Sequence, residues 1–393
     1  MENNKDKKLR IGIVCYPTYG GSGVLATELG LGLAKEGHQV HFITYSRPAR
    51  LSAFQENLFF HEVVIRDYPL FEFSPYDSAM ASTLVNVIKF EKLDILHVHY
   101  AIPHAAIAYM AKQILKAEGI NIPIVTTLHG TDISLVGTDP AFAPVVAFSI
   151  ENSDGVTAVS ESLRQQTYDY FKIKKDIKVI YNFIDYNRFK KCDKDHFKKA
   201  IAPHGERILV HVSNFRKLKR VEDVIKVFGK VNEIIPSKLL LIGDGPERQN
   251  MEQLCRELHL CNEIRFLGKQ DAIEELLAVS DVFLIPSGSE SFGLAALEAM
   301  ACEVPVISSN AGGLPEVNIH GVTGFLSEIG DVDDMVKNTL KILENDKVLN
   351  AFKKAAQEQA SNFDLRKILP QYEAFYREVI AEQKVEATTT SVN

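Results

Sequence analysis

The sequence lacks several features that would place it in common protein classes. No uncharged apolar run approaches the roughly 18 residues that a membrane-spanning helix needs. The N-terminal stretch MENNKDKKLR has no apolar region of a signal peptide, and the five cysteines are scattered without the paired spacing of a zinc or redox motif. The formal net charge is −7, so no basic excess attracts nucleic acid. We therefore expect a cytoplasmic protein without a nucleic-acid or membrane partner.

The composition is that of an ordinary globular protein. Hydrophobic residues make up 46% of the 393 residues and charged residues 24%. Because a single core usually stops growing below about 300 residues, this length indicates two domains. The chain contains no internal repeat of solenoid period and no low-complexity segment.

Short β-branched segments alternate with helical segments in two series. The first series runs from LRIGIVCY to IKVIYNFID, and the second runs from RILVHVSN to PVISSN. Continuous apolar strands that alternate with helices indicate a parallel sheet covered on both faces. We predict an α/β protein of two Rossmann-like, doubly wound lobes. Ligands should bind beyond the carboxyl ends of the strands, in a central cleft that the two lobes face.

A charged, irregular segment, YNRFKKCDKDHFKKAIAPHGE, interrupts the series and marks the domain boundary. We predict an N-terminal domain at residues 1–183, a linker at 184–206 and a C-terminal domain at 207–364. Residues 365–393 should form a C-terminal helix, which could pack on either lobe, and a frayed polar tail.

A glycine-rich turn, PTYGGSG, follows the first strand and precedes a helix. Gly20 and Gly21 allow the backbone to approach a ligand, and the helix N-terminus favours an anion. A tight turn without a ligand is the alternative. The spacing is not the G-x-G-x-x-G fingerprint of dinucleotide enzymes.

Histidines mark two further strand ends of the first lobe. The strand IPIVTTLHG brings Thr127 and His129 to its carboxyl edge, where His129 can hydrogen-bond a ligand or serve a structural role. In HVHY, His97 and His99 share one strand face. Such a pair can bind a metal, but no third ligand is evident and packing is the favoured interpretation.

A basic cluster, NFRKLKR, follows the first strand of the second lobe. Arg216, Lys217 and Lys219 precede a helix there. At a strand end such a cluster can neutralise a diphosphate, whereas a run of charges elsewhere is usually a solvated face.

The segment SGSESFGLAALEAM follows another strand, which ends at Ser287. We predict a helix that starts near Ser291 and directs its unpaired N–H groups at a phosphate. Glu290 would lie near the attached sugar, and Glu298, about two turns on, could reach ribose hydroxyls. Alternatively, Glu290 is an acid near the helix cap and Glu298 is an ordinary helix charge. The predicted phosphate-facing residues are Phe292, Gly293 and Leu294.

Together, the E-x7-E segment, the glycine-rich turn, the R-x-x-K cluster, the His129 strand end and GGLPE resemble retaining glycosyltransferases of family 4, which have the two-lobed GT-B fold. The resemblance spans nearly the whole chain. IGIVCYPTYGGSG, HFITYSRPAR, LHVHYAIPHA and HVSNFRKLKR are similar to the bacillithiol-pathway branch of the family. This similarity implies UDP-N-acetylglucosamine as the donor and L-malate as the acceptor, with no cofactor.

The resemblance also implies donor-binding and catalytic roles for matching residues. The C-terminal domain would bind the UDP-sugar, with Glu298 on the uridine ribose and Glu290 on the hexose. Arg216 and Lys219 would hold the diphosphate, helped by the turn at Gly20 and Gly21. Many relatives have a longer spacing between these cations, so Lys217 remains an alternative to Lys219. The implied catalytic residues are His129, Glu290, Arg216 and Lys219.

The N-terminal domain would bind the acceptor. The implied contacts to L-malate are Ser22, Tyr100, Thr127 and an arginine, either Arg47 or Arg50. Positive side chains would stabilise the departing UDP without a metal, since no D-x-D pair ends a strand. The resemblance implies retention of anomeric configuration by same-face attack.

Several alternatives to this function stay open. Another family 4 enzyme could use a different soluble acceptor such as inositol phosphate; a lipid acceptor would call for a basic amphipathic helix, which we do not find. The chain could also be an inactive sugar-nucleotide-binding protein. A nicotinamide-linked dehydrogenase is a weaker alternative because the dinucleotide fingerprint is missing. The sequence leaves a homo-oligomer open.

Overall fold

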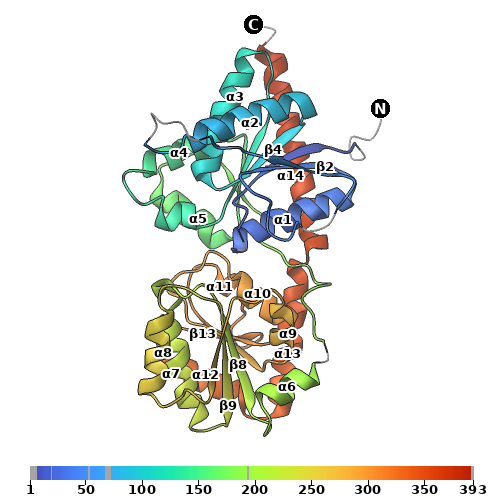
Figure 1. The fold of residues 1–393 in the computed structure, drawn as a ribbon. Helices are drawn as coiled ribbons and strands as arrows, with labels where there is room; N and C mark the ends of the chain where they lie inside the picture. Colours follow the sequence, from blue (N-terminus) through green and yellow to red (C-terminus); the bar gives the residue numbers. More distant parts are fainter. Residues whose placement is uncertain (1–6, 19, 52–53, 67–71, 193, 391–393) are drawn as a thin grey trace. The chain divides into compact units, whose positions relative to one another are not determined.

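The computed structural model describes residues 7–18, 20–51, 54–66, 72–192 and 194–390. The chain forms two compact units (Figure 1). Unit 1 is discontinuous and consists of the chain up to Asn182 and the part from Leu365 onward. Unit 2 comprises Phe183–Asp364. The chain enters and leaves unit 2 side by side, because Ile184 and Asp364 form a parallel β-bridge.

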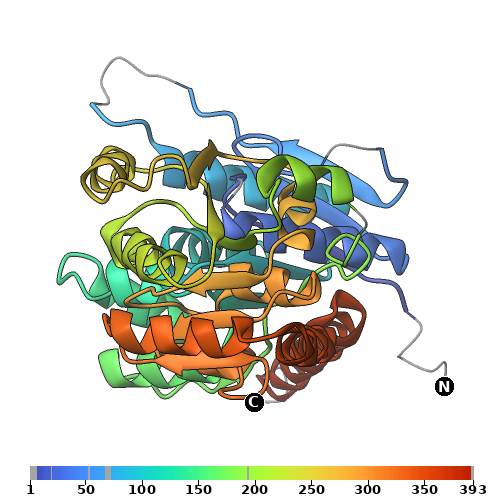
Figure 2. The same cartoon turned by 90° about the horizontal axis from the view of Figure 1, so that it is seen from below.

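Unit 1 contains a seven-stranded sheet in the order β3-β2-β1-β4-β5-β6-β7. All neighbouring strands are parallel, and helices cover both faces (Figures 1 and 2). The strands are β1 Arg10–Val14, β2 Gln39–Thr44, β3 Leu58–Glu62, β4 Ile95–His99, β5 Ile124–Leu128, β6 Gly155–Ala158 and β7 Ile177–Val179. The helices are α1 Gly21–Lys35, α2 Tyr76–Glu91, α3 Ala106–Ala117, α4 Ala143–Glu151, α5 Glu161–Tyr170 and α14 Leu365–Thr390.

Unit 2 contains a six-stranded parallel sheet in the order β10-β9-β8-β11-β12-β13. The strands are β8 Arg207–Val212, β9 Ser237–Ile242, β10 Ile264–Gly268, β11 Val282–Ile285, β12 Val306–Ser309 and β13 Gly324–Ser327. The helices are α6 Asp195–Ile201, α7 Val221–Asn232, α8 Arg248–Glu257, α9 Ile273–Ala278, α10 Leu294–Ala301, α11 Leu314–Val317, α12 Val332–Leu343 and α13 Asp346–Ala360.

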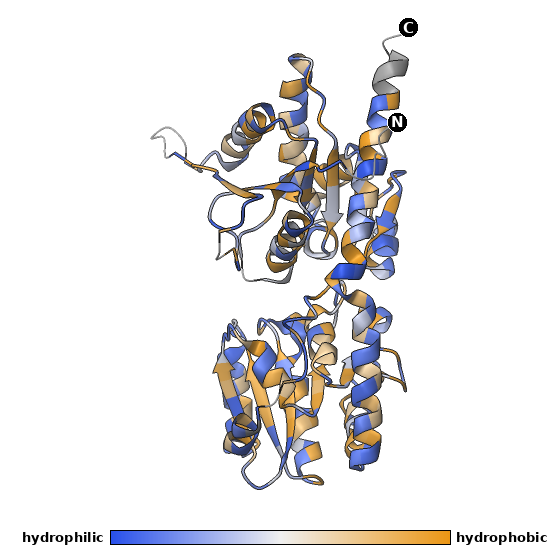
Figure 3. Cartoon of the chain, turned by 90° about the vertical axis from the view of Figure 1, so that its right-hand side faces the viewer, coloured by the Kyte–Doolittle hydropathy of each residue, from blue (hydrophilic) through white to orange (hydrophobic). Residues whose placement is uncertain are grey.

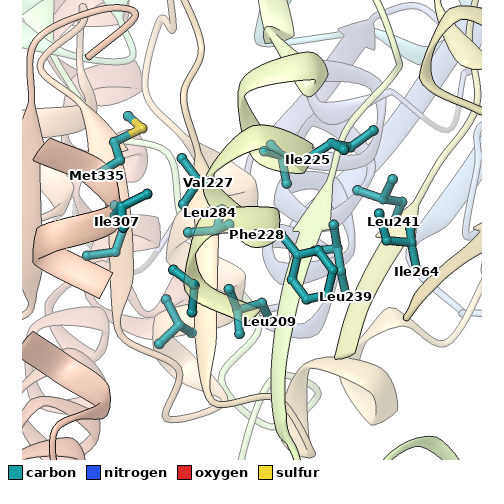
Figure 4. Packing of buried hydrophobic residues seen from close by; sticks show 14 of the residues in the cluster. Leu209, Ile225, Val227, Phe228, Leu239, Leu241, Ile264, Leu284, Ile307 and Met335 are labelled. Atoms are coloured by element: carbon teal, nitrogen blue, oxygen red, sulfur yellow. The ribbon is translucent and has the colours of Figure 1, made fainter. Parts of the chain in front are cut away.

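Apolar strands sandwiched between amphipathic helices make the core of each unit, and the strands are predominantly hydrophobic in Figure 3. In unit 2, Leu239 and Leu241 of β9 belong to one buried cluster with Ile225 and Phe228 of α7 (Figure 4). Ile225 and Phe228 lie three positions apart, so both face the sheet from one side of the helix. Burial on both faces explains why the strands read as continuous apolar runs.

The structure confirms the predicted fold class and corrects several segments. The predicted linker at 184–206 belongs to unit 2 and contains α6. The C-terminal helix belongs to unit 1, where it contacts α1, and it continues to Thr390 instead of fraying from Lys384. The sequence did not predict β3 or β13, whose burial is partial. Within the described ranges, no helix is both long and apolar enough to cross a membrane.

Candidate functional site

The strand order reverses once in each sheet, between β1 and β4 in unit 1 and between β8 and β11 in unit 2. At such a switch point the connections on either side run to opposite faces of the sheet, which leaves room for a ligand beyond the carboxyl ends of the strands. In unit 1, the glycine-rich turn follows β1, and the segment HVHY lies at the carboxyl end of β4. In unit 2, the basic cluster follows β8, and the E-x7-E segment follows β11. The topology thus brings these motifs together in pairs.

In unit 2, an ion pair links the basic cluster to the E-x7-E segment. Lys219 Nζ donates to Glu290 Oε1 at 2.5 Å, and Ser287 Oγ donates to the same oxygen at 3.0 Å. Both side chains of the ion pair are largely buried, whereas Lys217 and Arg216 are exposed. Lys219, not Lys217, is therefore the lysine that the fold places beside Glu290.

Helix α10 begins at Leu294, three residues later than the sequence predicted. Gly293 precedes it with φ 96°, a left-handed conformation that favours glycine, and no side chain caps the helix. The side chain of Phe292 is buried and packs edge-on against Phe363, with ring centroids 5.5 Å apart, whereas the predicted phosphate contact of Phe292 concerns its backbone N–H. The side chain of Phe292 therefore belongs to the core. The N–H groups that α10 leaves uncapped at its N-terminus start at Leu294.

Glu298 lies in the second turn of α10 and is only 8% exposed. Burial, and then the negative charge of Glu298, raises the pKa of the Cys302 thiol. Glu298 is thus a buried carboxylate and not a solvent-exposed one. Burying a carboxylate costs folding free energy unless hydrogen-bond partners or a ligand compensate for the lost water.

The glycines after β12 pack against the loop that carries Glu290. Gly313 N–H donates to the carbonyl oxygen of Glu290 at 2.9 Å. A Cβ atom at Gly312 would lie 1.9 Å from that same oxygen, so only glycine fits. The close approach is between two protein loops, and it positions Glu290.

In unit 1, a hydrogen bond joins the glycine-rich turn to the end of β4. Ser22 Oγ and Tyr100 Oη lie 2.5 Å apart, which brings together two of the predicted acceptor contacts. Burial raises the pKa of Tyr100 to about 12 although Ser22 lowers it. A Cβ at Gly20 would meet no heavy atom closer than 3.5 Å, so space remains at the N-terminus of α1, where Gly21 is the first residue.

His129 pairs with His99, which sequence reasoning had treated as packing. His129 Nε2 and His99 Nδ1 lie 2.8 Å apart. Burial lowers the pKa of His129 to about 3 and that of His99 well below its usual value, so both rings are neutral at pH 7 and one of them donates. His99 Nε2 is buried without a hydrogen-bond partner.

This orphaned nitrogen decides the direction of the bond. If His129 donated, His99 would carry its own proton on Nε2, and a buried N–H without an acceptor is costly. We therefore assign His99 as the donor through Nδ1. His129 then carries its proton on Nδ1, which makes that atom the donor toward a ligand.

Asp132 fixes the loop that presents His129, a role that the sequence analysis missed. Its carboxylate accepts the backbone N–H groups of Ala101 at 2.9 Å, Gly130 at 3.0 Å and His129 at 3.2 Å. Burial raises the pKa of Asp132 to about 6, against the lowering effect of these three donors. The position of Asp132, two residues after the strand-end Gly130, could have indicated this role. Short acidic side chains commonly accept hydrogen bonds from nearby backbone N–H groups.

Thr127 was predicted to contact the acceptor, but its side chain is fully buried. Its Oγ1 bonds His97 Nε2 and Thr157 Oγ1, each at 2.7 Å. His97 Nδ1 in turn bonds the hydroxyl of Tyr376 in α14 at 2.8 Å. Thr127 is therefore structural, and His97 has no ring nitrogen left for a metal.

The two candidate arginines differ in their surroundings. Arg50 pairs with Glu28 at 2.9 Å, so its charge is already engaged. Arg47 is exposed. Unit 1 thus assembles Ser22, Tyr100 and His129, with the rings of Tyr100 and His129 5.0 Å apart.

Comparisons with known proteins identify relatives of this chain. Residues 19–188 match the family described as glycosyltransferase family 4, and residues 193–359 match glycosyl transferases group 1. The chain is 48% identical to N-acetyl-alpha-D-glucosaminyl L-malate synthase of Bacillus anthracis, over 96% of this chain and 99% of that protein.

Solved structures share the fold. Sucrose-phosphate synthase of Thermosynechococcus elongatus has a TM-score of 0.79 at 21% identity, covering 95% of this chain and 100% of that one. Anabaena HepE, solved with UDP and glucose, has a TM-score of 0.78 at 20% identity, covering 93% of this chain and 99% of that one.

Proposed function

The chain belongs to glycosyltransferase family 4, and from this membership we propose that it transfers N-acetylglucosamine from UDP-N-acetylglucosamine to the hydroxyl of L-malate. The reaction would be the first step of bacillithiol biosynthesis and would retain the anomeric configuration. The observation that carries the proposal is the 48% identity with a protein named for this synthesis, over 96% of the chain.

The geometry of unit 2 suits the donor. Helix α10, eight residues long and without a side-chain cap, begins directly after Gly293, and Glu290 lies four residues before its first residue. Its free N–H groups and its dipole favour a phosphate. Both hydrogen bonds to Glu290 described above reach Oε1, so we assign Oε2 to a hexose hydroxyl. Glu298, which is buried in the second turn of α10, would contact the ribose.

The charges of unit 2 suit the departure of the leaving group. When the bond to the sugar breaks, negative charge collects on UDP, and Lys219, Arg216 and the start of α10 would stabilise it. Glu290 holds Lys219 in position before the donor arrives, so little reorganisation is needed. The leaving phosphate would accept the proton of the attacking hydroxyl, so no separate nucleophilic carboxylate is required.

The neutral site of unit 1 suits a hydroxylated acid. Ser22 and Tyr100 provide hydroxyl groups, and the uncapped N-terminus of α1 favours a carboxylate. His129 would donate through Nδ1 to the donor sugar, as the family resemblance implies. Arg47 is the remaining candidate for charge pairing. A cytoplasmic location and the absence of a cofactor stay predictions.

Measuring UDP release with UDP-N-acetylglucosamine, with and without L-malate, tests the proposal. We expect release that depends on malate, a product of the mass of the glycosylated acid, and an α linkage by NMR. A β linkage would contradict retention. Release with inositol phosphate but not with malate would favour another soluble acceptor, and tight UDP binding without release for any acceptor would favour an inactive binding protein.

A further inference from the structure

Three side chains that could bind a metal gather in unit 1, outside the site described above. His41 lies on β2, His61 on the neighbouring edge strand β3, and Glu91 is the last residue of α2. Each offers a ligand atom, and these atoms all lie within 4.8 Å of one another. Residues far apart in the sequence thus converge on one point of the fold.

The Glu91 end of this cluster lies near the amino-terminal ends of the strands, away from the candidate site. Arg10, the first residue of β1, has its guanidinium 3.5 Å from the carbonyl oxygens of Glu91 and Lys92. Glu91 is therefore near the amino end of β1, whereas Ser22, Tyr100 and His129 follow the carboxyl ends of strands. A ligand at the cluster would not be a substrate of the proposed reaction.

The two imidazoles are arranged much as two ligands of one ion. His41 Nδ1 and His61 Nε2 form a hydrogen bond of 2.9 Å, which a bound ion would replace, and the rings are tilted by only 20°. Two nitrogens bound to a tetrahedral zinc at about 2.0–2.1 Å lie about 3.3 Å apart, so a small separation would admit the ion. Phe59 stacks on His41 with centroids 4.6 Å apart and holds that ring in place.

The electrostatics also suit a cation. Glu91 offers a carboxylate oxygen beside the two imidazoles. Arg10 opposes a cation, but its guanidinium faces the two backbone carbonyls.

We propose that His41, His61 and Glu91 bind a divalent transition-metal ion of the zinc class. Two imidazole nitrogens with one carboxylate oxygen are a ligand set that zinc accepts, and they suit magnesium or calcium poorly. The ion has a structural role. It ties the edge strand β3 and the end of α2 to β2.

The test is zinc binding by tag-free protein that has been treated with EDTA and dialysed. Calorimetry should show about one equivalent of Zn²⁺, and Co²⁺ at the same site should give the visible absorption of a low-symmetry complex. His61→Gln and Glu91→Gln should each weaken the binding by about tenfold or more, since even outer partners of metal ligands contribute 10- to 100-fold. Buried His41 is left intact so that folding is preserved, as circular dichroism should verify.

His196→Gln is the matched control, because His196 is an exposed histidine on α6 of unit 2. It should leave zinc binding unchanged. The proposal is overturned if the wild-type protein binds no stoichiometric Zn²⁺, or if it binds the ion equally well after both His61→Gln and Glu91→Gln.

Discussion

At the switch between β1 and β4, unit 1 joins Ser22 to Tyr100 by a hydrogen bond of 2.5 Å, whereas at the switch between β8 and β11, unit 2 joins Lys219 to Glu290 at the same distance. One pair is neutral and the other is an ion pair. The parallel sheet determines where side chains converge in both units, and the residue types decide what converges there. A shared topology therefore accommodates two different ligand chemistries in one chain.

The units also differ in how they use histidine. Unit 1 buries His97, His99, His104 and His129 close together, whereas His211 is the buried histidine among the described residues of unit 2. Burial lowers the pKa of His97 and His129 to about 3, and that of His104 and His211 to about 4. Unit 1 thus contains most of the groups that must gain protons on unfolding in acid.

The largest expected difference is therefore in acid stability. A histidine that is neutral when folded and protonated when unfolded costs about 1.4 kcal/mol of folding free energy per pH unit below about 6.5. Six such groups in unit 1, these four histidines together with His41 and His61, outweigh Asp132, whose raised pKa of about 6 stabilises the fold as pH falls below that value. Unit 1 should open first as pH falls from 6.5.

Hydrogen exchange followed by mass spectrometry, corrected for the intrinsic pH dependence, can compare peptides from β4 and β5 with peptides from β8 and β9. Samples should contain EDTA. Earlier exchange in β8 and β9, or opening of both units at one pH, would contradict the prediction.

The second effect concerns the charged switch of unit 2. Lys219→Gln should lower kcat/KM for UDP-N-acetylglucosamine by about 10²- to 10³-fold, because it removes a positive charge where the leaving group becomes negative. Lys217→Gln is the matched control, since Lys217 is exposed and two residues away. Steady-state kinetics should show a change of less than about threefold for Lys217→Gln. Similar losses in the two variants would show that Lys219 has no special position.

A third, smaller effect separates the glycines of the two units. Gly312→Ala should destabilise the protein by about 1–3 kcal/mol, because its φ of 54° and the oxygen 1.9 Å from the new Cβ leave no room. Gly20→Ala should leave stability within about 1 kcal/mol of wild type, because φ is −74° and the nearest heavy atom is 3.5 Å away. Urea unfolding measures both. Equal midpoints for the two variants would refute the assignment of Gly312 to loop packing.

The smallest effect concerns the neutral site of unit 1. His99→Leu removes the hydrogen bond that orients His129, so kcat should fall about threefold to tenfold, corresponding to about 0.5–1.5 kcal/mol. His99→Asn retains a donor near the position of Nδ1 and should restore part of the loss. Kinetics and melting temperature should be measured together, because a purely structural role would lower stability in both variants without this difference in kcat.

Much of the fold was predictable from patterns that local physics imposes. Apolar strands alternating with helices indicated two parallel sheets, since a strand covered on both faces must be apolar throughout. The less apolar β3 and the four-residue β13 escaped this reasoning. The helix α10 was expected near Ser291 and begins at Leu294, because the left-handed Gly293 and the buried Phe292 delay its first turn.

The sequence by itself determined the two α/β units and which strand ends carry glycine, acid, base and histidine. Only the tertiary structure decided that Lys219 pairs with Glu290, that Thr127 faces the interior, and that His99 holds His129. The physical reason is range. Helix and strand patterns follow from neighbours within a few residues, whereas these contacts join segments about 30 to 70 residues apart, which are brought together by strand order in a sheet.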